Sequence, residues 1–223
     1  MITSPRILPA WVSQVSMHVE ETERAAAAIP LPPARMAASP EQQRDYRAGR
    51  YCAQLALEQI GVSKFVPGVN ENGGPAWPAD TVGSITHAMG LVSAAVAPRW
   101  RGVGIGLDLE PIGSLGKAHA LAGRVATSAE VLRLMDSAKT DFASAVTLIV
   151  AAKHSLYKCL HPQLGGRSFS YLDALIDEAP LGSGLFRARL KVTLSPSWPG
   201  GTMVTGQVEM AGDYIYTGIA LAC

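Results

Sequence analysis

The sequence predicts an α+β fold with helices and strands in both halves of the chain. Apolar residues recur at helical spacing after residue 40 and again over 141–160. Alternating segments typical of strands lie between 82 and 111 and fill the tail from residue 186 onward. This arrangement allows two similarly built halves, related by a pseudo-twofold axis, that meet near residue 110.

The length and composition fit such a division. The chain has 223 residues, of which 48% are hydrophobic, and this suits one large domain or two small ones with a buried core. We expect an N-terminal half over 1–110 and a C-terminal half over 111–223. The formal net charge of +1 argues against a strongly electrostatic nucleic-acid binder.

Three cysteines, Cys52, Cys159 and Cys223, have no close spacing. An odd number of scattered cysteines argues against a disulfide framework and fits a reduced, cytoplasmic compartment. The N-terminus lacks the charged and apolar regions of a signal peptide. The apolar run at 145–152 is far shorter than the roughly 20 residues that a membrane span needs. We therefore expect a cytoplasmic protein with no membrane partner.

The first half should contain a short strand within 11–19, followed by a long helix. Ser39 is a good N-cap residue, Pro40 suits the first helical position, and Gly61 is typical of a helix end. This helix carries three arginines that drift slowly round one face: Arg44, Arg47 and Arg50.

The middle of the chain contains strands and then a helix start. After a loop rich in Gly, Pro and Asn at 67–80, alternation predicts a strand at 91–97 and a second, buried strand over 101–111. Residues 112–127 favour no single structure. Thr127 resembles the first residue of a capping box that opens a helix.

The second half should consist of one long apolar helix and a strand-rich tail. The helix is expected over about 141–160. The tail predicts three antiparallel strands joined by Gly and Pro turns: 186–195, 201–210 and 214–222.

The octet GIGLDLEP places two carboxylates near the end of a strand. Because side chains at i and i+2 point to the same face of a strand, Asp108 and Glu110 should point the same way. Two like charges held together are unfavourable unless a cation lies between them, and Mg²⁺ with oxygen ligands meets that need. The alternative is that both are solvated residues in a turn before Pro111.

Cationic side chains should converge on such an ion if it holds a phosphorylated ligand. The stretch AAKHSLYK carries Lys153, His154 and Lys158 in an otherwise apolar helix. His154 and Lys158 are i,i+4 neighbours on one face. Arg50 and His87 are further candidates. Each also has a structural explanation: a solvated helix face for Arg50, a satisfied strand-end histidine for His87, and lysines that reach solvent along an apolar helix.

Four segments together resemble the 4′-phosphopantetheinyl transferases, in particular the broad-specificity branch that primes carrier domains of nonribosomal peptide and polyketide synthases. They are YRAGRYCAQLALEQIG (46–61), GGPAWPADTVGSITHAMG (73–90), VGIGLDLEP (103–111) and AAKHSLYKCLHP (151–162). Their order and spacing fit the family pattern GR-x-CA, P-x-WP…GS-[IL]-TH, G-[IV]-D-x-E-P and KE-[AS]-x-x-K. One such segment would be a weak signal, but four in the same order are specific.

The resemblance implies Mg²⁺-dependent transfer of 4′-phosphopantetheine from coenzyme A to a serine of an acyl or peptidyl carrier protein, with release of 3′,5′-ADP. It also implies an active site in the cleft between the halves of a single, monomeric chain. Asp108 and Glu110 would ligate the ion, and Lys158 would neutralise charge on the diphosphate. The other candidates would hold coenzyme A: Arg44, Arg50, Thr86, His87 and Lys153. Such chemistry rests on positioning and electrostatics at phosphoryl oxygens.

The chain departs from the family pattern at three positions. His154 stands where the family has a Glu that is taken as a third metal-side carboxylate and as the base for the carrier serine. A neutral imidazole can accept that proton, but it is a poor Mg²⁺ ligand beside oxygen donors. We therefore expect weaker metal binding and a preference for Mn²⁺. Gly74 stands where the family pattern has a basic residue. Gln43 stands where the pattern has an arginine, and Arg44, one position later, is a candidate to take its place.

These losses leave two alternatives open. One is a catalytically weakened or inactive relative that binds coenzyme A or a carrier protein without transfer. The other is an unrelated metal-dependent hydrolase built on Asp108 and Glu110, which would release product with no carrier present. A mass increase of an apo-carrier incubated with coenzyme A and Mg²⁺ separates transfer from both.

Overall fold

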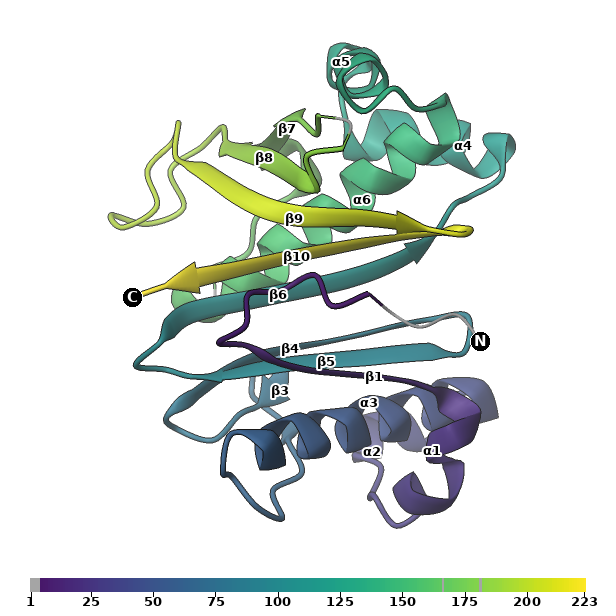
Figure 1. The fold of residues 1–223 in the computed structure, drawn as a ribbon, viewed down its shortest axis with the longest axis vertical. Coiled ribbons are helices and arrows are strands. Elements are labelled where there is room, and N and C mark those ends of the chain that lie inside the picture. The colour runs from purple at the N-terminus through teal and green to yellow at the C-terminus, as the bar shows by residue number, and fades with distance from the viewer. Residues whose placement is uncertain (1–4, 166, 181) are drawn as a thin grey trace.

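Two antiparallel sheets packed against helices form the framework of the chain in a computed structural model (Figure 1). The structure describes residues 5–165, 167–180 and 182–223. The three-stranded sheet, in the order β1-β5-β4, consists of Ser13–His18, Leu91–Pro98 and Thr81–Ala88. The five-stranded sheet, in the order β6-β10-β9-β8-β7, consists of Gly102–Pro111, Tyr214–Ala222, Met203–Ala211, Leu185–Leu190 and Ala174–Glu178. The predicted α+β class is confirmed.

Helices accompany both sheets. Those of the N-terminal side are α1 (Val19–Ala26), α2 (Pro33–Met36) and α3 (Pro40–Gln59). Those of the C-terminal side are α4 (Leu115–Val125), α5 (Ser128–Ala138) and α6 (Phe142–Leu160). A short ladder of β2 (Gly68–Val69) and β3 (Pro75–Ala76) lies in the loop before β4.

The long helix α3 lies against the three-stranded sheet. Its start is fixed by a capping box, in which the Ser39 hydroxyl accepts from the Gln42 amide and the Gln42 side chain accepts from the Ser39 amide. The buried face of the helix consists of small side chains, among them Ala48, Gly49, Cys52, Ala53 and Ala56. Because these side chains are short, the helix approaches the sheet closely. The longer polar residues of α3 lie along the edge of the helix.

Glycines on β6 bring α6 into direct contact with that strand. A Cβ atom at Gly106 would lie 1.8 Å from a backbone oxygen of α6. A Cβ atom at Gly104 would lie 2.6 Å from a backbone oxygen one turn further along that helix. Any side chain at these positions would push the helix away. Because side chains alternate along a strand, the face that carries these glycines also carries Asp108 and Glu110. The close approach therefore sets the distance between both carboxylates and α6.

Two hydroxyl side chains join the sheets edge to edge. Ser84 on β4 accepts a hydrogen bond from the Leu107 amide at 3.0 Å, and Thr86 accepts one from the Leu109 amide at 3.2 Å. The hydroxyls thus satisfy β6 amides that no neighbouring strand pairs at this edge, as buried backbone donors require. We call this junction between β4 and β6 the seam; a division of the chain near residue 110 stays a prediction.

The N-terminal segment packs across the outside of the seam. Ile7, Leu8 and Val12 are buried in a cluster shared with β5, β6 and β10. A Cβ atom at Gly218 would lie 2.7 Å from the Leu8 side chain, so the glycine makes room for this segment. The segment leads into β1, which confirms the strand predicted near the N-terminus.

The structure confirms some of the other predicted helices and strands and differs from the prediction elsewhere. The strands predicted at 91–97 and 101–111 and the helix near 141–160 are confirmed. The undecided segment 112–127 contains α4, and β7 was not predicted. The tail does form three antiparallel strands, although the first ends at Leu190, earlier than predicted. Among the described residues no helix combines the length and apolar character needed to cross a membrane.

Candidate active site

Asp108 lies at the seam and is almost completely buried, with 3% of its surface exposed. Its Oδ1 accepts from the Lys158 ammonium at 2.5 Å and from the Thr86 hydroxyl at 3.1 Å. Its Oδ2 lies 3.2 Å from Nδ1 of His154. Three elements, β4, β6 and α6, therefore hold one carboxylate, and these partners offset the cost of burying its charge.

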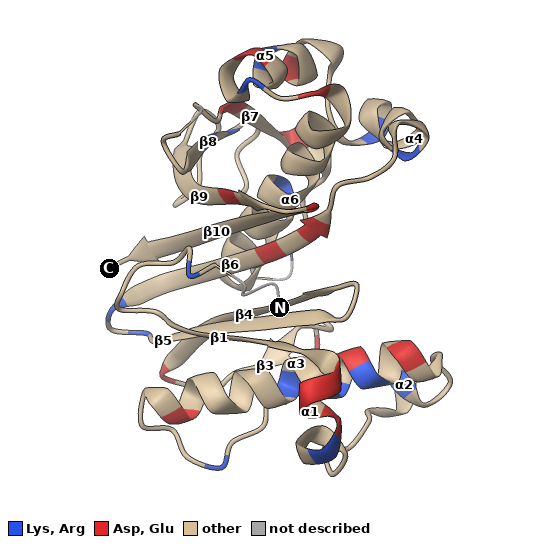
Figure 2. Cartoon of the chain, turned by 45° about the vertical axis from the view of Figure 1, so that its right-hand side comes forward, with Lys and Arg blue, Asp and Glu red and all other residues tan. Residues whose placement is uncertain are grey.

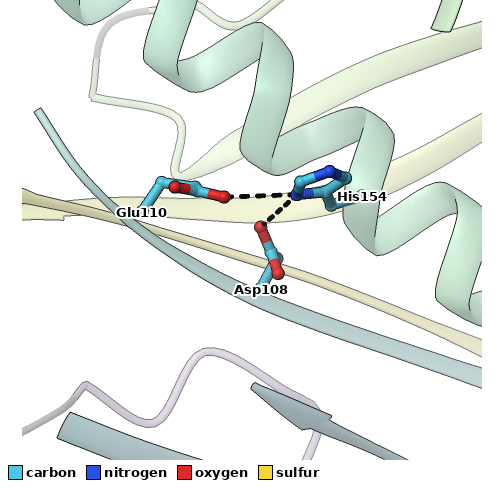
Figure 3. Close-up of side chains that lie close together, drawn as sticks. All are labelled: Asp108, Glu110 and His154. Carbon is cyan, nitrogen blue, oxygen red and sulfur yellow. Dashed lines mark hydrogen bonds and ion pairs between the residues drawn. The ribbon is translucent and has the colours of Figure 1, made fainter. Parts of the chain in front are cut away.

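His154 lies between the two carboxylates of β6 (Figure 3). Its Nδ1 is 3.2 Å from Asp108 Oδ2 and 3.2 Å from Glu110 Oε1. One ligand atom of each residue lies within 4.8 Å of the other two. The structure thus brings together the three residues that the sequence singled out as metal ligands, with an imidazole as the third donor.

The ion pairs determine the protonation of this cluster. Burial by itself would raise the pKa of Asp108, but Lys158 and His154 hold that pKa below its ordinary value. Burial also disfavours a charged His154, yet hydrogen bonds to Asp108 and Glu110 outweigh it and raise the pKa of His154 to about 9. Without a bound cation, the carboxylates are therefore neutralised by an imidazolium and an ammonium.

The two lysines of α6 point to different places. Lys158 joins the cluster and also donates to the Leu107 carbonyl at 3.0 Å. Lys153 is 3% exposed and pairs with Glu130 of α5 at 2.9 Å, while it donates to the Val125 carbonyl at 2.8 Å. Burial lowers the pKa of Lys153, and Glu130 opposes this effect. Lys153 therefore ties α6 to α5, and the structure does not bring it to the carboxylates.

Arg50 and His87 lie on the N-terminal side of the site. The Arg50 guanidinium stacks over the Tyr46 ring at 4.7 Å, and its buried Nε has no hydrogen-bond partner among the described residues. His87 Nδ1 lies 3.4 Å from Asp45. Arg44 points elsewhere, because it forms an exposed ion pair with a carboxylate of α1 at 3.2 Å.

On the N-terminal side the three-stranded sheet carries no Lys, Arg, Asp or Glu, whereas the helices carry charges of both signs. Figure 2 shows basic and acidic bands along α1–α3, whereas β4 and β5 carry no Lys, Arg, Asp or Glu. Two acidic bands mark the end of β6 in the same view, where Asp108 and Glu110 lie. The acidic pair therefore lies on a strand surrounded by uncharged sheet.

Tyr171 belongs to the cluster, although the sequence analysis did not single it out. Its hydroxyl is hydrogen-bonded to Nε2 of His154, and the two rings are 5.4 Å apart. Tyr171 opens a short 3-10 helix, η2 (Tyr171–Asp173), which lies between α6 and β7 in the chain. No periodicity or motif marks this residue, so only the folded chain reveals its contact.

Comparison with known proteins identifies the family. A family model described as the 4′-phosphopantetheinyl transferase N-terminal domain matches residues 32–97. The 4′-phosphopantetheinyl transferase Npt of Nocardia iowensis is 32% identical over 191 residues, which cover 82% of this chain and 83% of that protein. The chain belongs to the 4′-phosphopantetheinyl transferase family. It is an enzyme of the class that transfers phosphopantetheine to carrier proteins.

Further relatives of this transferase match most of the chain or a part of it. The 4′-phosphopantetheinyl transferase PptT of Mycobacterium tuberculosis (strain ATCC 25618 / H37Rv) is 28% identical over 225 residues and covers 96% of each chain. Enterobactin synthase component D of Escherichia coli (strain K12) is 36% identical over 131 residues, 59% of this chain and 61% of that protein.

Two cavities of the transferase flank the cluster. The larger, of about 630 Å³, lies between the loop before β4 and the end of α6, and Lys158, Ser84 and Gly74 line it. The smaller, of about 310 Å³, lies beside α6 and η2, and Tyr157, Tyr171 and His154 are among its lining residues. His154 of the cluster thus lines one of two spaces that can hold ligand, and Lys158 lines the other.

The donor set of this transferase fits a divalent cation with mixed ligation. Asp108 and Glu110 supply oxygen atoms, and His154 supplies one nitrogen atom within the same 4.8 Å span. Mg²⁺ prefers oxygen ligands throughout, whereas Mn²⁺ and later transition metals accept imidazole more readily. The residues therefore fit Mn²⁺ at least as well as Mg²⁺.

Proposed function

We propose that this transferase takes 4′-phosphopantetheine from coenzyme A and attaches it to a serine of an acyl or peptidyl carrier domain, of the kind found in nonribosomal peptide and polyketide synthases. The second product is 3′,5′-ADP. The observation that carries this proposal is the position of Asp108, Glu110 and Lys158 at the seam, beside two cavities. One chain supplies Asp108, Glu110, His154 and Lys158, which supports action as a monomer. We place this action in the cytoplasm.

The two cavities suit the two ends of coenzyme A, whose diphosphate joins a nucleotide to a pantetheine arm. We assign the nucleotide to the larger cavity beside Lys158 and the arm to the smaller cavity beside His154. The diphosphate then lies across the cluster. Arg50 and His87 do not line the larger cavity, but His87 lies on β4, which does. We assign both to the 3′-phosphate at its rim, because an anion supplies the partner that the buried Nε of Arg50 lacks among the described residues.

Asp108, Glu110 and His154 are the proposed ligands of a divalent cation. A bound cation draws negative charge from the diphosphate oxygens and so eases attack on phosphorus. Because one of the three donors is an imidazole, we expect weak Mg²⁺ binding and a preference for Mn²⁺.

Lys158 and Thr86 both donate to Oδ1 of Asp108. Thr86 donates to the carboxylate from β4 and holds it at the seam. In the reaction the serine oxygen forms a bond to the phosphorus that carries pantetheine and loses its proton to water, and the bond from that phosphorus to the bridging oxygen breaks. The electron pair of that bond goes to 3′,5′-ADP. Lys158 is close enough to neutralise the charge that develops there.

His154 is better suited to hold a metal than to act as the base for the serine. Both ring nitrogens have partners: Nδ1 faces Asp108 and Glu110, and Nε2 faces Tyr171. A general base needs a free nitrogen within reach of the proton. This geometry supports the ligand role over the base role.

Lys153 and Arg44, which the sequence analysis assigned to coenzyme A, are assigned structural roles instead. Lys153 is committed to Glu130 in the interior, and Arg44 pairs with Glu23 on α1. Each ion pair joins two helices of one side of the molecule.

The test of transfer is the mass of an apo-carrier incubated with the protein, coenzyme A and Mn²⁺ or Mg²⁺. Transfer predicts a mass increase of the carrier equal to one phosphopantetheine group, together with one 3′,5′-ADP. Binding of carrier or coenzyme A without any mass increase would support an inactive relative instead. Cleavage of coenzyme A in the absence of carrier would support a hydrolase.

The test of the metal proposal compares Mg²⁺ and Mn²⁺ titrations of the wild type and of His154→Glu. The wild type should reach half-maximal transfer at a lower concentration of Mn²⁺ than of Mg²⁺. The His154→Glu variant, with a third oxygen donor, should require less Mg²⁺ than the wild type. Identical Mg²⁺ dependence of the two proteins would contradict the proposed ligand role of His154.

A further inference from the structure

The His154 ring is held from both sides. Nδ1 lies 3.2 Å from a carboxylate oxygen of Asp108 and 3.2 Å from one of Glu110. On the opposite side of the ring, Nε2 is hydrogen-bonded to the hydroxyl of Tyr171. The side chain of His154 is 36% exposed, so its orientation depends on these contacts rather than on tight packing.

Tyr171 is itself fixed by its local structure. The Ser170 amide donates to the Asp173 side chain at 2.7 Å, which closes a capping box over the short helix η2. The Asp173 carbonyl accepts from the Lys191 amide at 2.7 Å, at the end of β8. The five-stranded sheet thus holds η2 in place, and the Tyr171 hydroxyl is presented to His154 from a rigid support.

A neutral imidazole can ligate a metal through Nδ1 only when Nε2 carries the proton. Ligating histidines meet this condition by donating the other N–H to an acceptor, which fixes both the tautomer and the ring orientation. A tyrosine hydroxyl is such an acceptor. Among the described residues, Tyr171 places its hydroxyl at Nε2.

We propose that Tyr171 is a positioning residue that selects the metal-ligating tautomer of His154 and aims its Nδ1 at the site shared with Asp108 and Glu110. This inference rests on the proposed metal site and deepens it. It explains how an imidazole functions where the family pattern has a carboxylate, because His154 and Tyr171 act as one unit. Loss of the hydroxyl leaves the Nε2–H without its acceptor and allows the ring to turn or to place its proton on Nδ1.

The experiment measures Mn²⁺ binding to the protein alone, by loss of the electron paramagnetic resonance signal of free Mn²⁺. Coupling of bound Mn²⁺ to nitrogen-14, measured by pulsed methods, reports imidazole ligation. The wild type should show this coupling. Tyr171→Phe keeps the ring and its packing but should weaken Mn²⁺ binding about 10–100-fold, which is the usual cost of losing such a partner.

The decisive control is the same change in a His154→Glu background. If Tyr171 acts through the imidazole, Tyr171→Phe should leave Mn²⁺ affinity unchanged when residue 154 is a glutamate. Tyr157→Phe is the matched control, because it removes a hydroxyl from the same cavity and should not alter Mn²⁺ affinity. Melting curves followed by circular dichroism confirm that each variant is folded.

Three results would overturn the inference: wild-type Mn²⁺ affinity in Tyr171→Phe, an equal loss in the His154→Glu background, or no nitrogen coupling in the wild type. The coupling needs no variant, so the inference stays testable even if one variant fails to fold. Neither coenzyme A nor carrier is present in these measurements. A wild type that shows the coupling but never modifies a carrier would therefore contradict the proposed function and leave the inference supported.

Discussion

The Lys158 ammonium lies 2.5 Å from a carboxylate oxygen of Asp108, a residue 50 positions earlier in the chain. This contact joins the end of β6 to the last turns of α6 beside the seam. Asp108 is almost fully buried, so its charge depends on this lysine as well as on His154 and Thr86. The two residues that would act on the diphosphate therefore also hold β6 and α6 together.

Replacing Lys158 by Met should therefore affect both transfer and stability. The rate of carrier modification should fall at least about 100-fold, because a cation facing the developing charge is lost. The free energy of unfolding should fall by an amount between the ~0–1 kcal/mol of an exposed pair and the ~3–5 kcal/mol of a buried one. Intact-mass assays and urea unfolding measure the two effects. If Lys158→Met matched the wild type in both transfer rate and free energy of unfolding, the proposed role of Lys158 in the site would be contradicted.

Lys153→Met should destabilise the protein without a specific loss of transfer. Its pair with Glu130 is buried, with 2% of each side chain exposed, and removing one partner leaves an uncompensated charge that costs roughly 3–5 kcal/mol. Lys139→Met is the matched control, because Lys139 pairs with Asp136 at the surface and its loss should cost about 0–1 kcal/mol. Urea unfolding of the three proteins checks the difference. A large drop in transfer by fully folded Lys153→Met would instead favour contact with coenzyme A.

Gly106→Ala should separate α6 from β6. The added Cβ would lie 1.8 Å from a backbone oxygen of the helix, so the strand or the helix must move, at a cost of about 1–3 kcal/mol or more. Transfer should fall too, because His154 and Lys158 move with the helix. Gly123→Ala is the control, since nothing lies within 4 Å of that position in α4 and alanine favours helix by about 0.5–1 kcal/mol. Equal thermal stability of the two variants would contradict the close approach.

The contribution of His154 to stability should depend on pH. Its pKa is raised from 6.5 to about 9 in the folded protein, so the charged imidazole stabilises the fold fully below pH 6.5. This contribution is lost as the pH rises through 9. In metal-free buffer, the difference in free energy of unfolding between the wild type and His154→Gln should shrink steadily across that range. A difference that stays constant or grows with pH would mean that the carboxylates do not hold the imidazolium.

The sequence predicted the elements that follow local rules. The strand that carries Asp108 and Glu110 was predictable because a continuous apolar run ends there. The helix that carries Lys158 was predictable because a long apolar segment suits α6. α4 escaped prediction because its glycines weaken the helical pattern, although Ser114 caps its first turn through the Lys117 amide.

The directions of individual side chains depend on long-range packing that no pattern contains. Lys153 and His154 are neighbours in sequence, yet the lysine reaches α5 while the histidine reaches β6. Predicting the pair of Lys153 and Glu130 would have required the position of α5 relative to α6, which only the folded chain supplies. Tyr171 likewise has no sequence signal, because its role arises from contact with a helix that ends ten or so residues earlier.

The most direct measurement is the rate at which Asp108→Asn modifies an apo-carrier with coenzyme A and Mn²⁺, followed by intact mass. Asparagine keeps the size of the side chain and removes the charge on which the proposed cation, Lys158 and His154 all depend. The account predicts a folded protein that transfers at least about 100-fold more slowly than the wild type, whereas Asp136→Asn at an exposed site transfers normally. Wild-type rates from Asp108→Asn would contradict it.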